Sequence, residues 1–310
     1  MKLLLTSTSF QDTPGKHHKL LEEQNFDVDY LRGPLKEDVL LPVIGNYDAI
    51  ICGDDEITEK VIEKGKSGRL KVISKYGIGL DKIDLNAAKK YGIPVTNTPG
   101  VNHIAVAEHT IALIFSYYKN LLNAFEITKR GEWKRPVGHE VFGKSILIIG
   151  LGRIGKELAV RCKALGLIVY ATDVFCDKEF FENNNINFVE NLSEAINLVD
   201  ILSVNCPLNE KTSGLINRQL LKNCKQELII VNTARAKIVN HDDLIWLLEN
   251  KKIAAYLTDV LEEEPVNRNN PLLKFENVFI TPHIGSRTYQ SVERQGLAAV
   301  ENLIKNISLC

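Results

Sequence analysis

Residues 146–156 read ILIIGLGRIGK, four aliphatic residues followed by glycines at positions 150, 152 and 155. The aliphatic run predicts a buried strand, and the residues after Gly155 predict a helix. Each glycine meets a different physical need, since Gly150 allows a tight turn, Gly152 lets a phosphate approach the backbone, and Gly155 lets helix and strand pack closely. The helix N-terminus offers unpaired N–H donors to a pyrophosphate. This stretch therefore predicts a dinucleotide-binding turn; a glycine turn that binds nothing is the simpler alternative.

An acidic residue, Asp173, closes the next strand-like run, LIVYATD at residues 167–173. A carboxylate at this position accepts hydrogen bonds from the adenosine ribose and repels a 2′-phosphate, which favours NAD over NADP. Methyltransferases that bind S-adenosylmethionine also use a glycine-rich first turn and a ribose-binding acid. This part of the chain alone does not separate the two ligands.

The glycine turn lies in the middle of a 310-residue chain, which is long enough for about two domains. Strand-like and helix-like segments alternate on both sides of it, and this alternation predicts α/β domains with parallel sheets. Five strands are expected at residues 2–7, 26–31, 47–53, 71–77 and 93–99, and six more at 145–150, 167–173, 200–207, 227–234, 254–260 and 277–282. The second set is a complete doubly wound unit by itself.

Two further segments carry structural expectations. Residues 105–131, AVAEHTIALIFSYYKNLLNAFEITKRG, predict one long helix that is apolar on much of its circumference. Such a helix needs more cover than one domain provides, so we expect a homodimer. His17 and His18 are expected in a polar loop without a functional role.

Composition argues against several classes of partner. The formal net charge is −1 and the pI about 6.7, so no overall positive field attracts nucleic acid or an anionic membrane. The six cysteines are scattered without metal-like pairing, which indicates reduced thiols in a cytoplasmic protein and no metal site. The apolar run near the N-terminus is too short for a signal-peptide core.

Three motifs after the glycine turn are expected at carboxyl ends of strands, the edge where doubly wound sheets bind ligands. VNTARAK carries Arg235, LTDVLEEEP carries Asp259 and Glu264, and ITPHIGS carries His283. Taken singly, each has an ordinary structural explanation: a surface arginine, an acidic turn, or a histidine that caps a helix. Their joint occurrence in this order is what points to a catalytic site.

Together these motifs resemble those of the D-isomer-specific 2-hydroxyacid dehydrogenase family, which includes D-3-phosphoglycerate dehydrogenases. That family carries a glycine fingerprint, an NxAR arginine, a DVxExEP acid pair and a TPHxG histidine in the same order. The segments KYGIGLDKIDLNAAKKYGIPVTNTPG, from residue 75, and NHIAVAEHT, from residue 102, match as well. The arginine, glutamate and histidine set has no use in a methyltransferase, so the S-adenosylmethionine alternative is excluded.

The resemblance implies NAD-dependent transfer of hydride between the cofactor and a small 2-hydroxy or 2-keto acid. Arg235 would bind the substrate carboxylate, because a guanidinium pairs with a carboxylate in a bidentate fork. His283 would be the general acid and base, and Glu264 would orient its imidazole and favour its protonated form. Cofactor contacts are expected from Gly150, Gly152, Arg153, Ile154, Gly155, Asp173, Pro207, Thr212, Thr233 and Asp259, the last of these holding the nicotinamide carboxamide. Substrate contacts are expected from Lys75, Tyr76, Gly77, Ile78, Gly79, Asn102 and Arg235.

The resemblance also implies the domain organisation. Residues 99–285 would form a Rossmann NAD-binding domain. Residues 1–98 and 286–310 would form a discontinuous, flavodoxin-like substrate-binding domain, with the active site in the cleft between the two. The chain departs from the family pattern at Ala236, Ala105 and Asn205, where glycine, serine and histidine are usual; no catalytic group is lost.

The substrate stays open between a phosphorylated acid and unphosphorylated acids such as glyoxylate or hydroxypyruvate. In phosphoglycerate dehydrogenases the loop corresponding to residues 51–58 carries cations, whereas here it offers Asp54, Asp55 and Glu56. Lys75 and Arg135 match cationic positions of those enzymes. An alternative of another class is a non-catalytic, NAD-sensing protein like the corepressors that share the fold, and turnover of any 2-keto acid with NADH would exclude it.

Overall fold

The computed structural model describes residues 1–307, and the chain separates into two compact units. Unit 1 consists of residues 1–102 and the segment from residue 286 onward, and unit 2 consists of residues 103–285. The division falls after residue 102 and not after residue 98, because helix α6 of unit 2 begins at His103. Unit 1 is therefore discontinuous in the chain.

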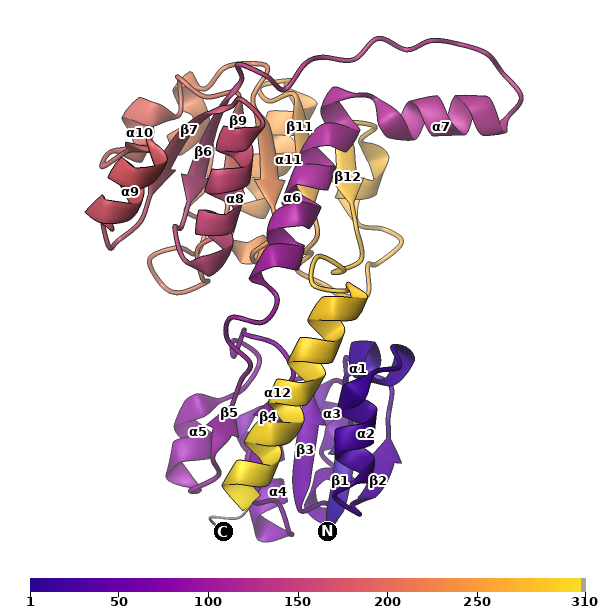
Figure 1. Ribbon diagram of the computed structural model, residues 1–310. Coiled ribbons are helices and arrows are strands. Elements are labelled where there is room, and N and C mark those ends of the chain that lie inside the picture. The colour runs from indigo at the N-terminus through magenta and orange to yellow at the C-terminus, as the bar shows by residue number, and fades with distance from the viewer. Residues whose placement is uncertain (308–310) are drawn as a thin grey trace. The chain divides into compact units, whose positions relative to one another are not determined.

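The sheet of unit 1 has five parallel strands in the order β2-β1-β3-β4-β5. This is the flavodoxin-like order, as expected from the sequence. Helices cover both faces of the sheet (Figure 1), so the three central strands β1, β3 and β4 are buried, whereas β2 and β5 at the two edges are partly exposed. Their bounds are β1 Lys2–Leu5, β2 Asp27–Tyr30, β3 Ala49–Cys52, β4 Val72–Lys75 and β5 Val95–Thr96.

Alternate residues of these strands enter two different apolar clusters, as the two-residue period of a strand requires. Leu4, Ile50 and Ile73 face one cluster with α4 and α5, and Leu3 and Leu5 face the other with α2 and α12. The helices of unit 1 are α1 Thr8–Asp12, α2 Lys16–Glu22, α3 Glu37–Leu40, η1 Ile44–Asn46, α4 Glu59–Ser67, α5 Leu85–Lys90 and α12 Tyr289–Ile307.

The expectation for His17 and His18 was wrong. Both residues lie in helix α2, and the side chain of His17 is fully buried against Phe10 and α12. A Cβ atom at Gly296 of α12 would come within 2.5 Å of the His17 ring, so the two helices meet at a glycine there. The polar residues around His17 do not predict its burial, because Gly296, which packs against its ring, lies far away in the chain.

The sheet of unit 2 has seven parallel strands in the order β12-β11-β10-β9-β6-β7-β8. Six of them coincide with the strands expected from the sequence. The seventh, β8, pairs only two residues with β7 and is too short to leave a periodic signal. The strands are β6 Ser145–Ile149, β7 Ile168–Thr172, β8 Asn187–Phe188, β9 Ile201–Val204, β10 Ile229–Asn232, β11 Ala255–Thr258 and β12 Val278–Ile280.

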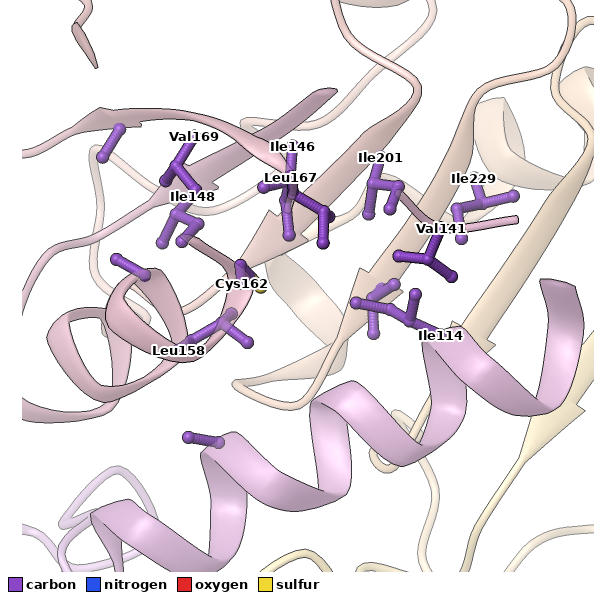
Figure 2. Packing of buried hydrophobic residues seen from close by; sticks show 14 of the residues in the cluster. Ile114, Val141, Ile146, Ile148, Leu158, Cys162, Leu167, Val169, Ile201 and Ile229 are labelled. Atoms are coloured by element: carbon purple, nitrogen blue, oxygen red, sulfur yellow. The ribbon is translucent and has the colours of Figure 1, made fainter. Parts of the chain in front are cut away.

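Helices α6 and α8 pack side by side on one face of this sheet. Ile114 of α6 and Leu158 and Cys162 of α8 point toward Ile146 and Ile201 of the central strands (Figure 2). The helices of unit 2 are α6 His103–Tyr118, α7 Leu121–Lys129, α8 Arg153–Ala164, α9 Lys178–Asn184, α10 Leu192–Ala195, η2 Leu220–Asn223, η3 Ala236–Ile238, α11 His241–Glu249 and η4 Pro271–Lys274.

The single long helix expected at residues 105–131 is two helices. Asn120 takes a left-handed conformation (φ 52°), which ends α6 and starts α7 in a new direction. Helix α6 is covered by its own unit, whereas α7 and the following loop extend away from the sheet (Figure 1). No helix within residues 1–307 has the length and apolar character needed to cross a membrane.

Candidate active site

The glycine turn lies between β6 and α8, where each glycine meets a different constraint. Gly150 has a φ of 96°, and a Cβ atom there would come within 2.6 Å of the backbone nitrogen of Cys206. A Cβ atom at Gly155 would overlap the carbonyl oxygen of Gly150. A Cβ atom at Gly152 would meet nothing within 4 Å, so the space in front of this residue is open to a ligand.

Helix α8 begins directly after Gly152, with no side chain capping its N-terminus. Its first N–H groups are therefore available to an anion such as a pyrophosphate. Arg153 is exposed at this end and Ile154 is half-buried. The turn thus has the donors, the open space and the close packing that a dinucleotide requires.

Asp173 follows β7 and is half-buried beside the turn. Its carboxylate accepts hydrogen bonds from the backbone N–H groups of Leu151, at 2.6 Å, and Phe175, at 3.1 Å. The carboxylate is thereby fixed next to the turn, where a ribose would lie. The side chains of Val174 and Phe175 that follow are exposed and carry no positive charge.

The remaining expected cofactor residues lie in loops at the same edge of the sheet. After β9, the hydroxyl of Thr212 donates to the carbonyl of Pro207 at 2.6 Å and closes that loop. After β10, the hydroxyl of Thr233 lies 3.0 Å from that of Thr110 on α6. Both threonine hydroxyls therefore already have protein partners that hold the loops in shape.

Arg235 follows β10, in a loop organised by Asn232. The side chain of Asn232 is fully buried; its Oδ1 accepts from the N–H of Ala234 and its Nδ2 donates to the carbonyl of Arg235, both at 3.0 Å. The same Nδ2 atom of Asn232 also donates to the hydroxyl of Tyr256 at 3.2 Å. Asn232 is a functional residue that was not predicted from the sequence, although it is the asparagine of the NxAR motif.

Glu264 and His283 are in direct contact. The Oε2 atom of Glu264 lies 2.8 Å from Nδ1 of His283, and its Oε1 accepts from the N–H of Leu261 at 2.9 Å. Because an ionised carboxylate only accepts hydrogen bonds, the shared proton belongs to Nδ1 of His283. Of the two ring nitrogens, Nε2 is then the one that does not contact Glu264.

Arg235, Glu264 and His283 follow β10, β11 and β12, which are neighbours in the sheet, so all three belong to one edge. Asp259, which directly follows β11, is buried, with 3 % of its surface exposed. It accepts from Thr281 Oγ1 at 2.6 Å and from the N–H groups of Ile284 and Gly285 at 2.8 and 2.7 Å. Burial opposes its ionisation, but these bonds and His109 hold the pKa of Asp259 below its usual range.

In unit 1, the loop at residues 77–79 follows β4. Gly77 has a φ of 122° and exchanges hydrogen bonds with Thr98, and the carbonyl of Ile78 accepts from Asn97 at 2.8 Å. Within residues 1–307, the N–H groups of Ile78 and Gly79 have no acceptor. Two adjacent free N–H groups of this kind suit a carboxylate.

Three other expected substrate residues of unit 1 are largely buried. Lys75 donates to Asp54 at 2.7 Å and to the carbonyl of Gly53 at 2.5 Å, with 5 % of its side chain exposed. Tyr76 and Asn102 are 7 % and 9 % exposed; within the described chain, the Tyr76 hydroxyl and the Asn102 Oδ1 atom have no hydrogen-bond partner. Lys75 is therefore a neutralised cation and not an open one.

The loop at residues 51–58 does not present all three of its carboxylates to solvent. Asp55 is turned inward, 1 % exposed, and accepts from Thr6, Leu35 and Gly53. Burial raises the pKa of Asp55 against the effect of these bonds. Residues 1–307 contain no group of three or more histidine, cysteine, aspartate or glutamate residues able to hold a metal ion.

Comparison with known proteins gives the relatives of this chain. Residues 111–285 match the family model described as "D-isomer specific 2-hydroxyacid dehydrogenase, NAD binding domain". The chain is 36% identical over 307 residues to a D-3-phosphoglycerate dehydrogenase of Methanocaldococcus jannaschii, covering 98% of this chain and 57% of that enzyme. It is 36% identical over 281 residues to a glyoxylate reductase of Thermofilum pendens, covering 87% and 81% of the two chains.

Among solved structures, the TT0316 protein from Thermus thermophilus superposes with a TM-score of 0.88 at 32% identity, over 99% of this chain and 97% of the other. The chain spans little more than half the length of the first two phosphoglycerate dehydrogenases that it matches, 57% and 54%. The relatives thus agree on the architecture while carrying different substrate names.

Proposed function

This chain belongs to the D-isomer-specific 2-hydroxyacid dehydrogenase family, and on that premise we propose that it interconverts a small 2-keto acid and its D-2-hydroxy acid with NAD(H). The observation that carries the proposal is the 2.8 Å contact between Glu264 and His283, at the sheet edge where Arg235 follows the neighbouring strand β10. A histidine oriented by a carboxylate is the group that proton transfer to a carbonyl oxygen needs.

The residues divide the reduction between them. Arg235 binds the substrate carboxylate, and its guanidinium also polarises the adjacent carbonyl. In unit 1, the N–H groups of Ile78 and Gly79 are donors of the kind that a carboxylate accepts. Bound NADH supplies the hydride that the carbonyl carbon gains. His283 gives the proton on its Nε2 to the carbonyl oxygen, so the products are the hydroxy acid and a neutral imidazole, which regains its proton from solvent.

Glu264 keeps His283 in the tautomer and orientation that present Nε2, since its Oε2 atom holds the Nδ1 proton. The same carboxylate favours the charged imidazolium before transfer. In the oxidation direction His283 takes the hydroxyl proton instead.

The cofactor residues are those of the glycine turn and the strand ends around it. Gly150, Gly152 and Gly155, with the first N–H groups of α8, suit the pyrophosphate, and Asp173 suits the ribose. Arg153, Ile154, Pro207, Thr212, Thr233 and Asp259 complete the proposed set. For Asp259 only Oδ2 has capacity for a carboxamide, because its other oxygen already receives Thr281 and Ile284.

For the substrate we propose an unphosphorylated acid such as glyoxylate or hydroxypyruvate. Lys75, the buried cation of the loop, is already neutralised by Asp54, so it offers little to a phosphate. Arg135 is exposed on the loop after α7 and stays a candidate for a second anionic group. Tyr76, Gly77 and Asn102 complete the proposed substrate set.

A panel of 2-keto acids assayed with NADH tests the activity. We expect turnover of glyoxylate or hydroxypyruvate, with kcat/KM for 3-phosphohydroxypyruvate no higher than for hydroxypyruvate. A strong preference for the phosphorylated acid would show that Arg135 outweighs the neutralised Lys75. No turnover of any member would favour the non-catalytic, NAD-sensing alternative.

We further propose that the protein is a cytoplasmic homodimer. The five cysteines within residues 1–307 are free thiols, which is typical of a reducing compartment. Large apolar side chains are exposed on α7 and the loop after it: Leu122, Phe125, Trp133, Val137 and Phe142, between 48 % and 89 %. A patch of this kind on one projecting segment suits a second copy of the chain.

A further inference from the structure

The loop that carries His283 is held in a conformation that its residues do not favour by themselves. His283 has a φ of 54°, in the left-handed region that side chains other than glycine rarely adopt. Such a conformation persists only when surrounding contacts fix it. The contacts around residues 281–285 therefore decide whether His283 faces Glu264.

Asp259 supplies most of these contacts. It receives Thr281 Oγ1 on one side of His283 and the N–H groups of Ile284 and Gly285 on the other. The packing is tight, because a Cβ atom at Gly285 would lie 2.9 Å from Oδ2 of Asp259 and 3.4 Å from the ring of His109. The carboxylate thus clamps both ends of a short loop with the catalytic histidine in the middle.

His109 of α6 completes the clamp. Its Nε2 atom lies 3.0 Å from Thr281 Oγ1 and 3.5 Å from Oδ1 of Asp259. The single hydroxyl hydrogen of Thr281 is directed at Asp259, at 2.6 Å; its other acceptor, the carbonyl of Thr258, is at 3.5 Å. Since that hydrogen is taken, the imidazole must be the donor to Thr281, so Nε2 of His109 carries a proton.

We propose that His109 is a positioning residue for His283, which it never touches. It donates from a helix packed on the sheet of unit 2 and thereby fixes Thr281 and Asp259, which fix the loop that presents His283 to Glu264. The inference rests on the proposed function, because it assigns His109 a part in that reaction. It predicts a loss in the chemical step without a loss in cofactor binding.

The test compares two histidines of the same helix. His109→Leu removes the donor, while His103→Leu removes a histidine whose Nε2 atom lies 3.9 Å from the carboxylate of Glu157 on α8. We expect His109→Leu to lower kcat about tenfold, since small displacements of a catalytic group have effects of this size or larger. KM and the dissociation constant of NADH should stay within about twofold, and His103→Leu should leave kcat within about twofold.

Conservative variants separate positioning from general damage. His109→Gln keeps an N–H donor of similar reach and should recover most of the lost kcat. Thr281→Val removes the hydroxyl that links His109 to Asp259, and its effect should not add to that of His109→Leu, because both break one chain of contacts. If His109→Leu does not fold, the pair His109→Gln and Thr281→Val carries the test.

A second readout needs no turnover. Nδ1 of His283 lies 2.8 Å from Oε2 of Glu264. The proton on this Nδ1 atom is expected to give a low-field NMR signal that is absent in His283→Ala. His109→Leu and Thr281→Val should weaken or shift this signal, and His103→Leu should not. If the wild-type protein reduces no 2-keto acid, the proposed function is wrong. The NMR signal then still tests whether His109 positions His283, because it is measured without turnover. Active protein whose kcat and signal respond alike to His109→Leu and His103→Leu would overturn the positioning role.

Discussion

His283 is the residue on which the proposed chemistry depends, because Glu264 orients its imidazole at the edge formed by β10, β11 and β12. His283→Ala is expected to lower kcat by about 100- to 10,000-fold, the usual contribution of general acid–base catalysis, with NADH affinity largely kept. The measurement is kcat on the best 2-keto acid, with deuterated NADH to show that hydride transfer limits the rate. Near-normal kcat under that condition would return His283 to a structural role.

His17 carries a pH-dependent contribution to stability. Burial lowers its pKa, a trend that its neighbour His18 reinforces and that the Phe10 carbonyl and Glu293 oppose. Because the folded protein binds this proton more weakly than the unfolded chain, stability falls as the pH drops below about 6.5 and levels off below the folded-state pKa.

His17→Phe removes the titration while retaining an apolar ring. Urea unfolding of wild type and variant at pH 7 and pH 5 should show the wild type losing more of its unfolding free energy than the variant on acidification. A difference between the two proteins that does not change with pH would contradict the expectation.

The connection between β6 and α8 separates two uses of glycine. Gly155→Ala forces an overlap with the Gly150 carbonyl, so we expect a loss of about 1–3 kcal/mol in unfolding free energy and a lower Tm. Gly152→Ala is the matched control: its φ of −69° suits any residue and its Cβ atom meets open space.

We therefore expect Gly152→Ala to keep its Tm and to bind NADH about tenfold more weakly, because the added methyl group occupies the space of the phosphate. Thermal unfolding and a fluorescence titration measure the two effects. Equal losses of Tm in both variants would show that the turn is only structural.

The end of β7 determines cofactor choice. Asp173 is fixed by Leu151 and is followed by two exposed apolar residues, so it opposes a 2′-phosphate without a compensating cation beside it in sequence. We expect kcat/KM with NADH to exceed kcat/KM with NADPH. Asp173→Asn keeps an acceptor for the N–H of Leu151 and should lower the ratio of these two kcat/KM values about tenfold. Equal or better turnover with NADPH by the wild type would refute this.

For the molecule as a whole, the exposed apolar segment of α7 and the loop after it predicts self-association. Light scattering at micromolar concentration should show a species of twice 34.8 kDa. Trp133→Asp should shift it toward the monomer, because Trp133 is 80 % exposed in this segment. Tyr30→Asp, at an exposed position of unit 1, is the control that should stay dimeric; a monomeric wild type would contradict the homodimer.

Local patterns were enough for the architecture. The glycine spacing, the alternation of strands and helices and the order of the motifs around Arg235, Glu264 and His283 each depend on residues close together in the chain, so the family and two parallel-sheet α/β domains could be predicted from them. The strand-end rule then brought the motifs to one edge, since parallel strands of one sheet end together.

Contacts between distant residues were decided by tertiary packing alone. The burial of His17 under Gly296, the pairing of Lys75 with Asp54 and the donation from His109 to Thr281 join segments with no common local pattern. The break at Asn120 likewise depends on a left-handed residue inside a sequence that reads as continuous helix. Periodicity records which face of an element is apolar, but only the folded chain determines which polar group meets which, because that pairing is set by the packing of whole elements.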